Sequence, residues 1–181
     1  MLTRNQLLLS KGLKVKRSNH GKCAKAKYNS LRFMIEFVVA IVVVLLVFTT
    51  VIGFSRVDGV SMNPTLQDSQ RIVYLRIGNE YEVGDIVAIR MPNGDRYVKR
   101  VIALEGDSVE LKDGAVYVNG KKLQESYIQG ETLPENDRVK YPYIVEKDAV
   151  FVLGDNREES IDSREFGAVI KKNVKGRILV H

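Results

Sequence analysis

The sequence predicts a mostly β, antiparallel domain preceded by one transmembrane helix. An 18-residue segment without a charge, residues 37–54, is followed by a succession of short runs rich in β-branched residues. Turn-forming dipeptides such as Asp113-Gly114 separate these runs, and they favour antiparallel hairpins because a type I′ turn needs two positive φ values. After residue 54, no stretch has apolar residues at the 3.6-residue period of a helix, so little further helix is expected.

Positive charge is concentrated at the N-terminus. Residues 1–36 hold nine Lys and Arg against one acid, Glu36, whereas residues 55–181 hold 19 basic against 21 acidic side chains. The net charge of +6 therefore belongs to a basic tail, and no groove for nucleic acid is indicated in the rest of the chain. Because residues 1–30 are polar and basic, we expect them to be disordered.

The uncharged segment 37–54 has the length of a membrane-spanning helix. Its 18 residues would extend roughly 27 Å as a helix, close to the thickness of a bilayer's hydrocarbon core. The cations before it predict a single-pass protein of the cell membrane, with a cytoplasmic tail and with residues 55–181 outside. A cleaved signal peptide is the alternative, since Gly53 and Ser55 are small, but its apolar region is normally about 7–15 residues long. We favour the uncleaved anchor.

The chain after the anchor is predicted to be a series of strands. The expected strands are residues 71–77, 85–91, 96–104, 108–112, 115–119, 149–154, 168–170 and 176–180. Residues 121–147 contain fewer apolar residues and two prolines, Pro134 and Pro142. We therefore expect a small β or irregular insert, about residues 105–148, within the β-rich domain 55–181.

Histidine and cysteine are too scarce for most hydrolytic chemistry. The only cysteine, Cys23, and one of the two histidines, His20, lie in the basic tail, and the other, His181, ends the chain. Apart from the chain-end His181, residues 55–181 therefore have no His or Cys to activate a serine in a triad, and neither a metal site nor an organic cofactor is expected. If Ser61 in Asp58-Gly-Val-Ser-Met-Asn-Pro-Thr-Leu66 is a nucleophile, its base must be Lys, Asp or Glu.

Lys99 is the lysine best placed to act as that base. Strand alternation puts it on one face with Tyr97 and Val101, and burial among apolar groups lowers the pKa of an amine because it disfavours the charged form. The other lysines between residues 55 and 170 lie in or beside turns and polar stretches. An edge-strand lysine that prevents aggregation is the more common interpretation of such a pattern, so the pattern alone leaves both open.

A third segment, Gly154-Asp-Asn-Arg-Glu-Glu-Ser-Ile-Asp-Ser-Arg-Glu-Phe-Gly167, concentrates charge directly after an apolar strand. Such a composition is usual for a solvated surface loop. Alternatively, Asp155, Arg157, Asp162 and Arg164 form a charge network that fixes a loop beside an active site, and Ser160 hydrogen-bonds a neutral lysine amine.

These segments together resemble the boxes of bacterial type I signal peptidases, membrane-anchored Ser/Lys endopeptidases of the peptidase S26 type. Ser61-Met-Asn-Pro-Thr-Leu66 resembles the nucleophile box, and Gly84-Asp-Ile-Val87 the second box. Arg96-Tyr-Val-Lys-Arg-Val101 with Gly106-Asp107 resembles the general-base box. The segment 154–167 is similar to the last box at every fixed position. The ordered matches cover nearly all of residues 37–181.

The resemblance implies a role for each matching residue. Ser61 would attack the scissile carbonyl, and its backbone N–H would stabilise the oxyanion. Lys99 would be the general base and then the general acid, with its amine oriented by Ser160. The structural residues would be Asp155, Arg157, Asp162, Arg164 and Arg100. Substrate would contact Gly59, Val60, Met62, Pro64, Tyr97 and Val98.

One position departs from part of the family. Some members carry a serine two residues before the nucleophile as a second oxyanion donor, and here that position is Gly59. The second donor is then absent, or is replaced by the Gly59 backbone or by water. The family's shorter, single-anchor form also has glycine there, and this chain resembles that form.

The expected function is cleavage of signal peptides from exported preproteins, after small-x-small residues, at the membrane surface. The implied partners are preprotein signal peptides, the lipid bilayer and the secretion translocon. Two alternatives stay open: a catalytically silent anchored homologue that binds exported proteins, and a self-cleaving Ser/Lys protease. Because the front of the chain is a membrane segment rather than a DNA-binding domain, the self-cleaving type is disfavoured.

Overall fold

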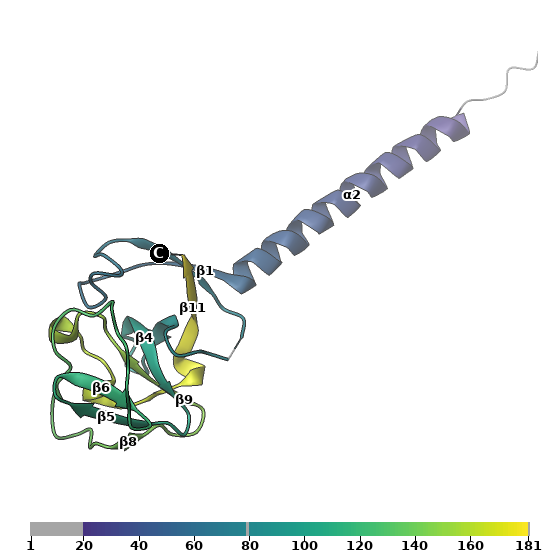
Figure 1. Cartoon of the computed structure of the whole chain (residues 1–181). Helices are drawn as coiled ribbons and strands as arrows, with labels where there is room; N and C mark the ends of the chain where they lie inside the picture. Colours follow the sequence, from purple (N-terminus) through teal and green to yellow (C-terminus); the bar gives the residue numbers. More distant parts are fainter. Residues whose placement is uncertain (1–19, 79, 181) are drawn as a thin grey trace, which may run out of the picture. The chain divides into compact units, whose positions relative to one another are not determined.

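The computed structural model describes residues 20–78 and 80–180, without the side chains of residues 20–27 and 180. Residues 1–19 of the basic tail and His181 lie outside the described residues. The chain forms two compact units, Met1–Val47 and Phe48–His181. The described part of the first unit is helical, and the second is rich in β-strands (Figure 1).

The helix α2 spans His20–Val51. Its section Tyr28–Val51 has 24 residues and is apolar and long enough to cross a membrane. The expectation of disorder is wrong for residues 20–30, which form the N-terminal part of helix α2. Ala24, Lys25 and Ala26 favour helix, and no proline interrupts the segment. At the other end, α2 stops three residues before the predicted limit of residue 54 because a strand begins at Ile52.

That strand, β1 (Ile52–Arg56), forms an antiparallel hairpin with β2 (Arg71–Leu75). Gly53 is a poor helix former but suits this strand, since a Cβ there would overlap the ring of its cross-strand partner Tyr74. The apolar appearance of residues 52–54 continued that of the membrane segment, so sequence alone did not separate strand from helix.

The β-strands form a seven-stranded and a four-stranded sheet, and every pairing between named strands is antiparallel, as predicted. The large sheet has the order β1-β2-β11-β3-β4-β9-β10. Its other members are β3 (Ile86–Arg90), β4 (Arg96–Leu104), β9 (Ala149–Leu153), β10 (Val169–Ile170) and β11 (Val174–Val180). The remaining helical segments are short: Arg157–Glu159, α3 (Ser163–Phe166) and Lys171–Asn173.

The small sheet is formed by the predicted insert. Its order is β7 (Lys121–Lys122), β6 (Ala115–Val118), β5 (Ser108–Lys112) and β8 (Tyr143–Ile144). Figure 1 shows β5, β6 and β8 at the end of the domain opposite β1. The turn between β5 and β6 has positive φ at Asp113 (52°) and Gly114 (69°), as the dipeptide predicted. The two-residue strands β7 and β8 were not predicted because they are too short to show alternation.

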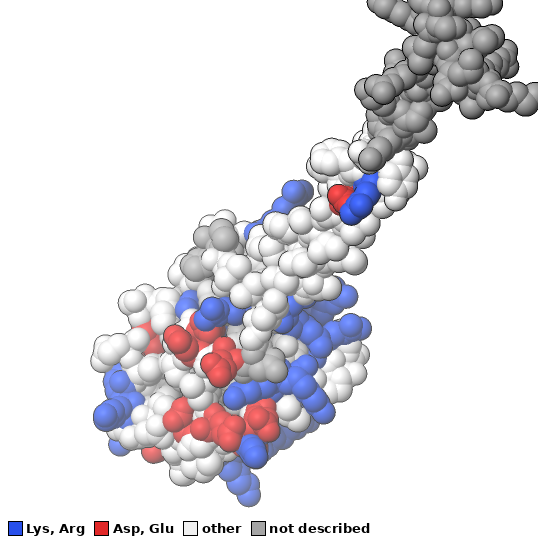
Figure 2. Space-filling view, turned by 90° about the vertical axis from the view of Figure 1, so that its right-hand side faces the viewer, with Lys and Arg blue, Asp and Glu red and all other residues white. Residues whose placement is uncertain are grey.

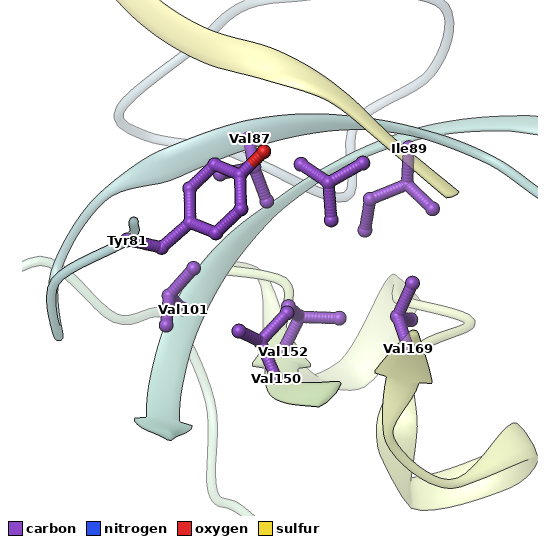
Figure 3. Packing of buried hydrophobic residues seen from close by; sticks show 8 residues of the cluster. Tyr81, Val87, Ile89, Val101, Val150, Val152 and Val169 are labelled. Carbon is purple, nitrogen blue, oxygen red and sulfur yellow. The ribbon is translucent and has the colours of Figure 1, made fainter. Parts of the chain in front are cut away.

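Three apolar clusters form the core. One lies on one face of β3, β4 and β9 and includes Val87, Val101 and Val152, whose side chains point toward one another (Figure 3). The second joins the large sheet to the insert through Ile102, Phe151 and Val116. The third packs Met62 and Leu66 against β2, β3 and β11. The segment that carries Ser61 is thus attached to the sheet by its own apolar residues.

Candidate active site

Ser61 lies in a turn that is fixed by backbone hydrogen bonds. Within the turn, Asn63 N–H donates to Val60 C=O (3.0 Å) and Leu66 N–H donates to Met62 C=O (2.9 Å). From the loop after β9, Asn156 N–H donates to Ser61 C=O (3.0 Å) and its side-chain amide donates to Val60 C=O (3.3 Å). The side chain of Met62 is buried in the third apolar cluster and anchors the turn to the large sheet. Ser61 therefore has a defined position relative to the large sheet.

Lys99 is buried on the apolar face of β4, as the alternation predicted. Its side chain is 1% exposed, and Val87 of β3 is its cross-strand partner. Nζ lies 5.7 Å from the centroid of the Tyr97 ring. Burial lowers the pKa of the Lys99 amine from 10.5 to about 8, although the negative charges of Asp162 and Asp155 act in the opposite direction. The interpretation as an exposed edge-strand lysine does not fit this position.

The Lys99 amine and the Ser61 hydroxyl are in direct contact. Nζ and Oγ are 2.7 Å apart, within hydrogen-bond distance, although the two residues are 38 positions apart in the chain. When the amine is neutral, its lone pair can accept the hydroxyl proton. The arrangement therefore has the geometry of a nucleophile with its general base.

Ser160 lies next to this pair, but its hydroxyl has a different partner from the expected one. Ser160 Oγ donates to Asp162 Oδ2 (2.8 Å), and among the hydrogen bonds of the described residues Lys99 Nζ contacts only Ser61. Gly154 marks how closely these groups approach, since a Cβ at Gly154 would overlap Ser160 Oγ and lie 2.6 Å from Ser61 C=O. Orientation of the amine by Ser160 stays a prediction.

The charged residues of the last box are buried in ion pairs. Arg100 binds Asp155 through two hydrogen bonds (2.8 and 2.6 Å), and Asp155 also accepts one from Thr65 Oγ1 (2.5 Å). Arg164 pairs with Asp162 at 2.9 Å. Asp162 Oδ2 further accepts from Gly154 N–H (3.0 Å). The charged residues Asp155, Arg157, Asp162 and Arg164 of this loop are thus buried rather than solvated, and Asp155 joins the loop to Thr65 and Arg100, close in sequence to Ser61 and Lys99.

Several residues of this network were not predicted. Arg157 pairs with Glu125 (2.5 Å) and hydrogen-bonds Thr132, both in the insert, and Arg100 stacks on the Tyr127 ring at 3.9 Å. Nothing in the local sequence singles out these insert residues, because their partners are about 30 positions away. Asn156 was within the quoted box but had no assigned role; its position between two network residues was the available signal.

A pocket of about 710 Å³ opens beside Ser61. It is lined by the chain from Phe54 to Asp58 and by residues 96–98 of β4. Both of these segments have an unpaired edge: β1 is the outer strand of the large sheet, and β4 pairs with β9 only from Arg100 onward. An extended peptide could add to either edge.

The predicted substrate contacts are distributed over three places. Tyr97 and Val98 line the pocket that contains Ser61. Val60 and Pro64 line a second pocket of about 450 Å³ on the other side of the turn. Met62 is completely buried in the core, and Gly59 lines neither pocket.

The backbone at Gly59 and Ser61 bears on oxyanion stabilisation. Gly59 has φ of +91°, which favours glycine, and its N–H donates to Asp68 Oδ1 (2.7 Å). This hydrogen bond is also the main cause that lowers the pKa of Asp68. Within the described part of the chain, by contrast, Ser61 N–H donates to no protein acceptor. Ser61 N–H is thus available to a ligand, whereas Gly59 N–H is already used.

Comparisons with known proteins identify the family. The family model described as signal peptidase, peptidase S26, matches residues 30–181. This chain belongs to that family. It is a serine endopeptidase of the signal peptidase I type that removes signal peptides from preproteins, and its apolar helix fits a membrane anchor. The silent, purely binding homologue is therefore not retained.

Individual signal peptidases are similar over most of their length. Signal peptidase IB of Staphylococcus aureus strain Mu50 is 35% identical over 169 residues, which cover 84% of this chain and 88% of the relative. Signal peptidase I of Bacillus licheniformis is 40% identical over 166 residues, 83% and 87% of the two chains. The crystal structure of a signal peptidase I from Enterococcus faecalis V583 is 34% identical, covers 56% of this chain and 97% of its own, and has a TM-score of 0.47.

The depressed pKa of Lys99 predicts a stability cost that depends on pH. The fall from 10.5 to about 8 corresponds to about 3 kcal/mol, because each pKa unit is worth about 1.4 kcal/mol. Below pH 8 both folded and unfolded chains carry the proton and the full cost is present. Between pH 8 and 10.5 the unfolded chain binds more protons, so the folded state gains stability as pH rises.

We therefore expect Lys99→Met to stabilise the protein at pH 7 by about 2 kcal/mol, after loss of about 1 kcal/mol for the hydrogen bond to Ser61. The gain should disappear toward pH 10.5. Thermal unfolding of the detergent-solubilised protein at several pH values measures it, with the exposed Lys112→Met as matched control. A Lys99→Met variant less stable than the wild type at pH 7 would contradict the proposed cost.

Proposed function

We propose that Ser61 and Lys99 form the catalytic dyad of this signal peptidase. The single observation that carries the proposal is the 2.7 Å contact between Ser61 Oγ and the buried Lys99 Nζ. Supporting it, the pKa of Lys99 is lowered to about 8, so that a useful fraction of the amine is neutral near physiological pH.

In the acylation step, Lys99 accepts the Ser61 proton while Oγ attacks the carbonyl carbon of the scissile bond. The oxygen that becomes negative accepts a hydrogen bond from Ser61 N–H, an interaction worth about 3 kcal/mol in comparable sites. Lys99, now an ammonium, protonates the departing amine as the C–N bond breaks. The new N-terminus of the mature protein leaves, and the signal peptide stays as an ester on Ser61.

In the deacylation step, the neutral Lys99 amine accepts a proton from water, which attacks the ester carbonyl. Collapse of the second tetrahedral intermediate returns the proton to Ser61 and releases the signal peptide. The ion pairs Arg100–Asp155 and Arg164–Asp162 do not exchange protons in this scheme. They hold the loop that hydrogen-bonds Ser61 C=O, and Ser160 orients the amine.

Cleavage after small-x-small residues is consistent with the pocket beside Ser61. The upstream peptide would add to the open edge of residues 96–98 and to the chain before Ser61, so that alternate side chains point at the sheet. Val57, Ala88 and Val98 line the pocket with short side chains. These apolar positions are compatible with small substrate side chains.

The proposed topology places the N-terminus in the cytoplasm and residues 55–181 outside the membrane. The nine basic residues before the anchor support this orientation. The lipid bilayer and the secretion translocon are the proposed partners, because a preprotein must reach the peptidase while its signal peptide is still in the membrane.

The direct test of the dyad is substitution of either member. Ser61→Ala and Lys99→Ala should each reduce processing of a labelled preprotein in detergent by at least about 10³-fold, because nucleophile or base is lost. Exposed Lys122→Ala is the control and should retain wild-type activity. EDTA should have no effect. Near-normal activity of Lys99→Ala would exclude the dyad assignment, and strong inhibition by EDTA would indicate a metal enzyme.

The pH profile tests the role of the amine. With a Lys99 pKa of about 8, kcat/KM should rise about tenfold from pH 7 to 9 and then level off, since only the neutral amine accepts the proton. The profile is measured on wild-type protein at a temperature well below its unfolding temperature at every pH used. A flat profile over this interval would mean that Lys99 is not the group that must lose a proton.

The single cysteine provides a test of the topology. Cys23 lies in the basic tail, so a membrane-impermeant maleimide should label it only after the cells are permeabilised. In a Cys23→Ser, Lys122→Cys variant, the exposed new thiol should be labelled in intact cells. Labelling of Cys23 in intact cells would reverse the proposed orientation.

A further inference from the structure

The pocket beside Ser61 has a strongly one-sided charge. Its lining includes Arg56, Arg76, Arg90, Arg96 and Lys175, against one acid, Asp58. This imbalance is local, because residues 55–181 as a whole carry slightly more acids than bases. Figure 2 likewise shows Lys and Arg gathered over one part of the β-rich domain, while Asp and Glu gather over another.

Three of these cations, the cationic rim, come from adjacent strands: Arg90 of β3, Arg96 of β4 and Lys175 of β11. All three are exposed, and no ion pair or hydrogen bond of their side chains is present among the described residues. The acid nearest in sequence, Asp95, accepts hydrogen bonds from the Asn93 amide (2.7 Å) and the Tyr97 hydroxyl (3.2 Å) instead.

The rim also contains an unfavourable contact of the sheet. Arg90 and Arg96 are directly opposite each other in the β3–β4 register. Like charges in this arrangement destabilise a sheet, and here no acid compensates them. An anionic group bound in the pocket would relieve the repulsion.

The position of the rim indicates which part of a substrate it meets. In the proposed function the small-residue specificity lies upstream of the scissile bond, and the pocket is lined by Ser61 and by two open strand edges, so the upstream peptide is its occupant. Arg96 is three residues before Lys99 on β4, or about 10 Å at about 3.3 Å per residue. A substrate peptide paired with this strand edge has the same rise per residue. Its fourth or fifth residue before the scissile bond therefore lies beside Arg96 and Arg90.

We propose that the cationic rim is a specificity determinant: it favours preproteins with Asp or Glu four or five residues before the scissile bond and disfavours Lys or Arg there. The inference rests on the proposed function. The interaction between the rim and the substrate side chain is one between exposed charges, so its energy is small. It therefore gives a preference between substrates rather than a requirement, and salt screens it.

The test uses full-length protein in a nonionic detergent without lipid. The substrates are one preprotein with Ser, Asp or Lys placed singly at the second, fourth, fifth or sixth residue before the cleavage site; the first and third stay small. At 50 mM NaCl we expect the kcat/KM ratio of Asp to Lys to be about three- to tenfold at the fourth or fifth position and smaller elsewhere. At 1 M NaCl this ratio should fall toward one.

Charge reversal identifies the residues that read the substrate. Arg96→Gln should reduce the preference at that position, and Arg96→Glu, which places an acid opposite Arg90, should bring the Asp-to-Lys ratio close to one. Arg138→Glu, an equal change of net charge at an exposed site of the insert, should leave the preference and the turnover of the Ser substrate as in wild type. Unfolding temperatures of the three variants show that each is folded.

Each outcome separates this inference from the proposed function. Suppose that Ser61→Ala no longer cleaves the preprotein with Ser at the test position, and that the wild-type enzyme has an Asp-to-Lys ratio near one. This result would overturn only the role of the rim. An Asp-to-Lys ratio that keeps its wild-type value in Arg96→Glu would also overturn the role of the rim. So would a ratio that is largest two residues before the cleavage site. If phosphatidylglycerol vesicles change activity in wild type but not in Arg96→Glu, while substrate charge has no effect, the rim binds lipid headgroups instead.

Discussion

Burial of the Lys99 amine governs the organisation of the candidate site. A lysine in water is almost fully protonated at neutral pH and cannot act as a base. Here the apolar cluster of Val87, Val101 and their neighbours surrounds the stem, so desolvation lowers the pKa. Asp162 and Asp155 limit the shift, because their negative charge favours the ammonium form. The result, about 8, leaves the amine both available as a base and able to return a proton.

A desolvated Lys99 amine can accept the Ser61 proton only if the Ser61 hydroxyl is held next to it. The buried ion pairs fix the loop that holds the Ser61 turn in this position. The loop after β9 contacts the Ser61 turn through Asn156, and its arginines and aspartates bind one another and the insert. Buried pairs of this kind add little net stability, but a broken pair is costly, so they specify one arrangement of the loop. The insert therefore supports the candidate site through Glu125 although it contributes no residue to the proposed dyad.

The sequence indicated much of this arrangement for identifiable reasons. Strands β2 to β6, β9 and β11 alternate or are strongly β-branched, and Asp-Gly or Asn-Gly follows β3, β5 and β6, so local chemistry was sufficient. Strand β1 was missed because Ile52 and Phe54 continue the apolar membrane segment, and only pairing with β2 makes them a strand. Thr65, Glu125 and Tyr127 were missed because their contacts join distant parts of the chain. The Ser160–Asp162 hydrogen bond was also decided by packing.

By itself, the sequence determined the chemical possibilities. Residues 55–180 contain no His or Cys, which restricted the candidate bases for Ser61 to Lys, Asp or Glu. Strand alternation placed Lys99 between apolar neighbours. Only the tertiary structure decided that Nζ and Oγ meet, that Gly59 N–H is bound to Asp68, and that three cations from three strands surround one pocket. The physical reason is that burial and charge interaction depend on distances in space, which a sheet creates between residues far apart in the chain.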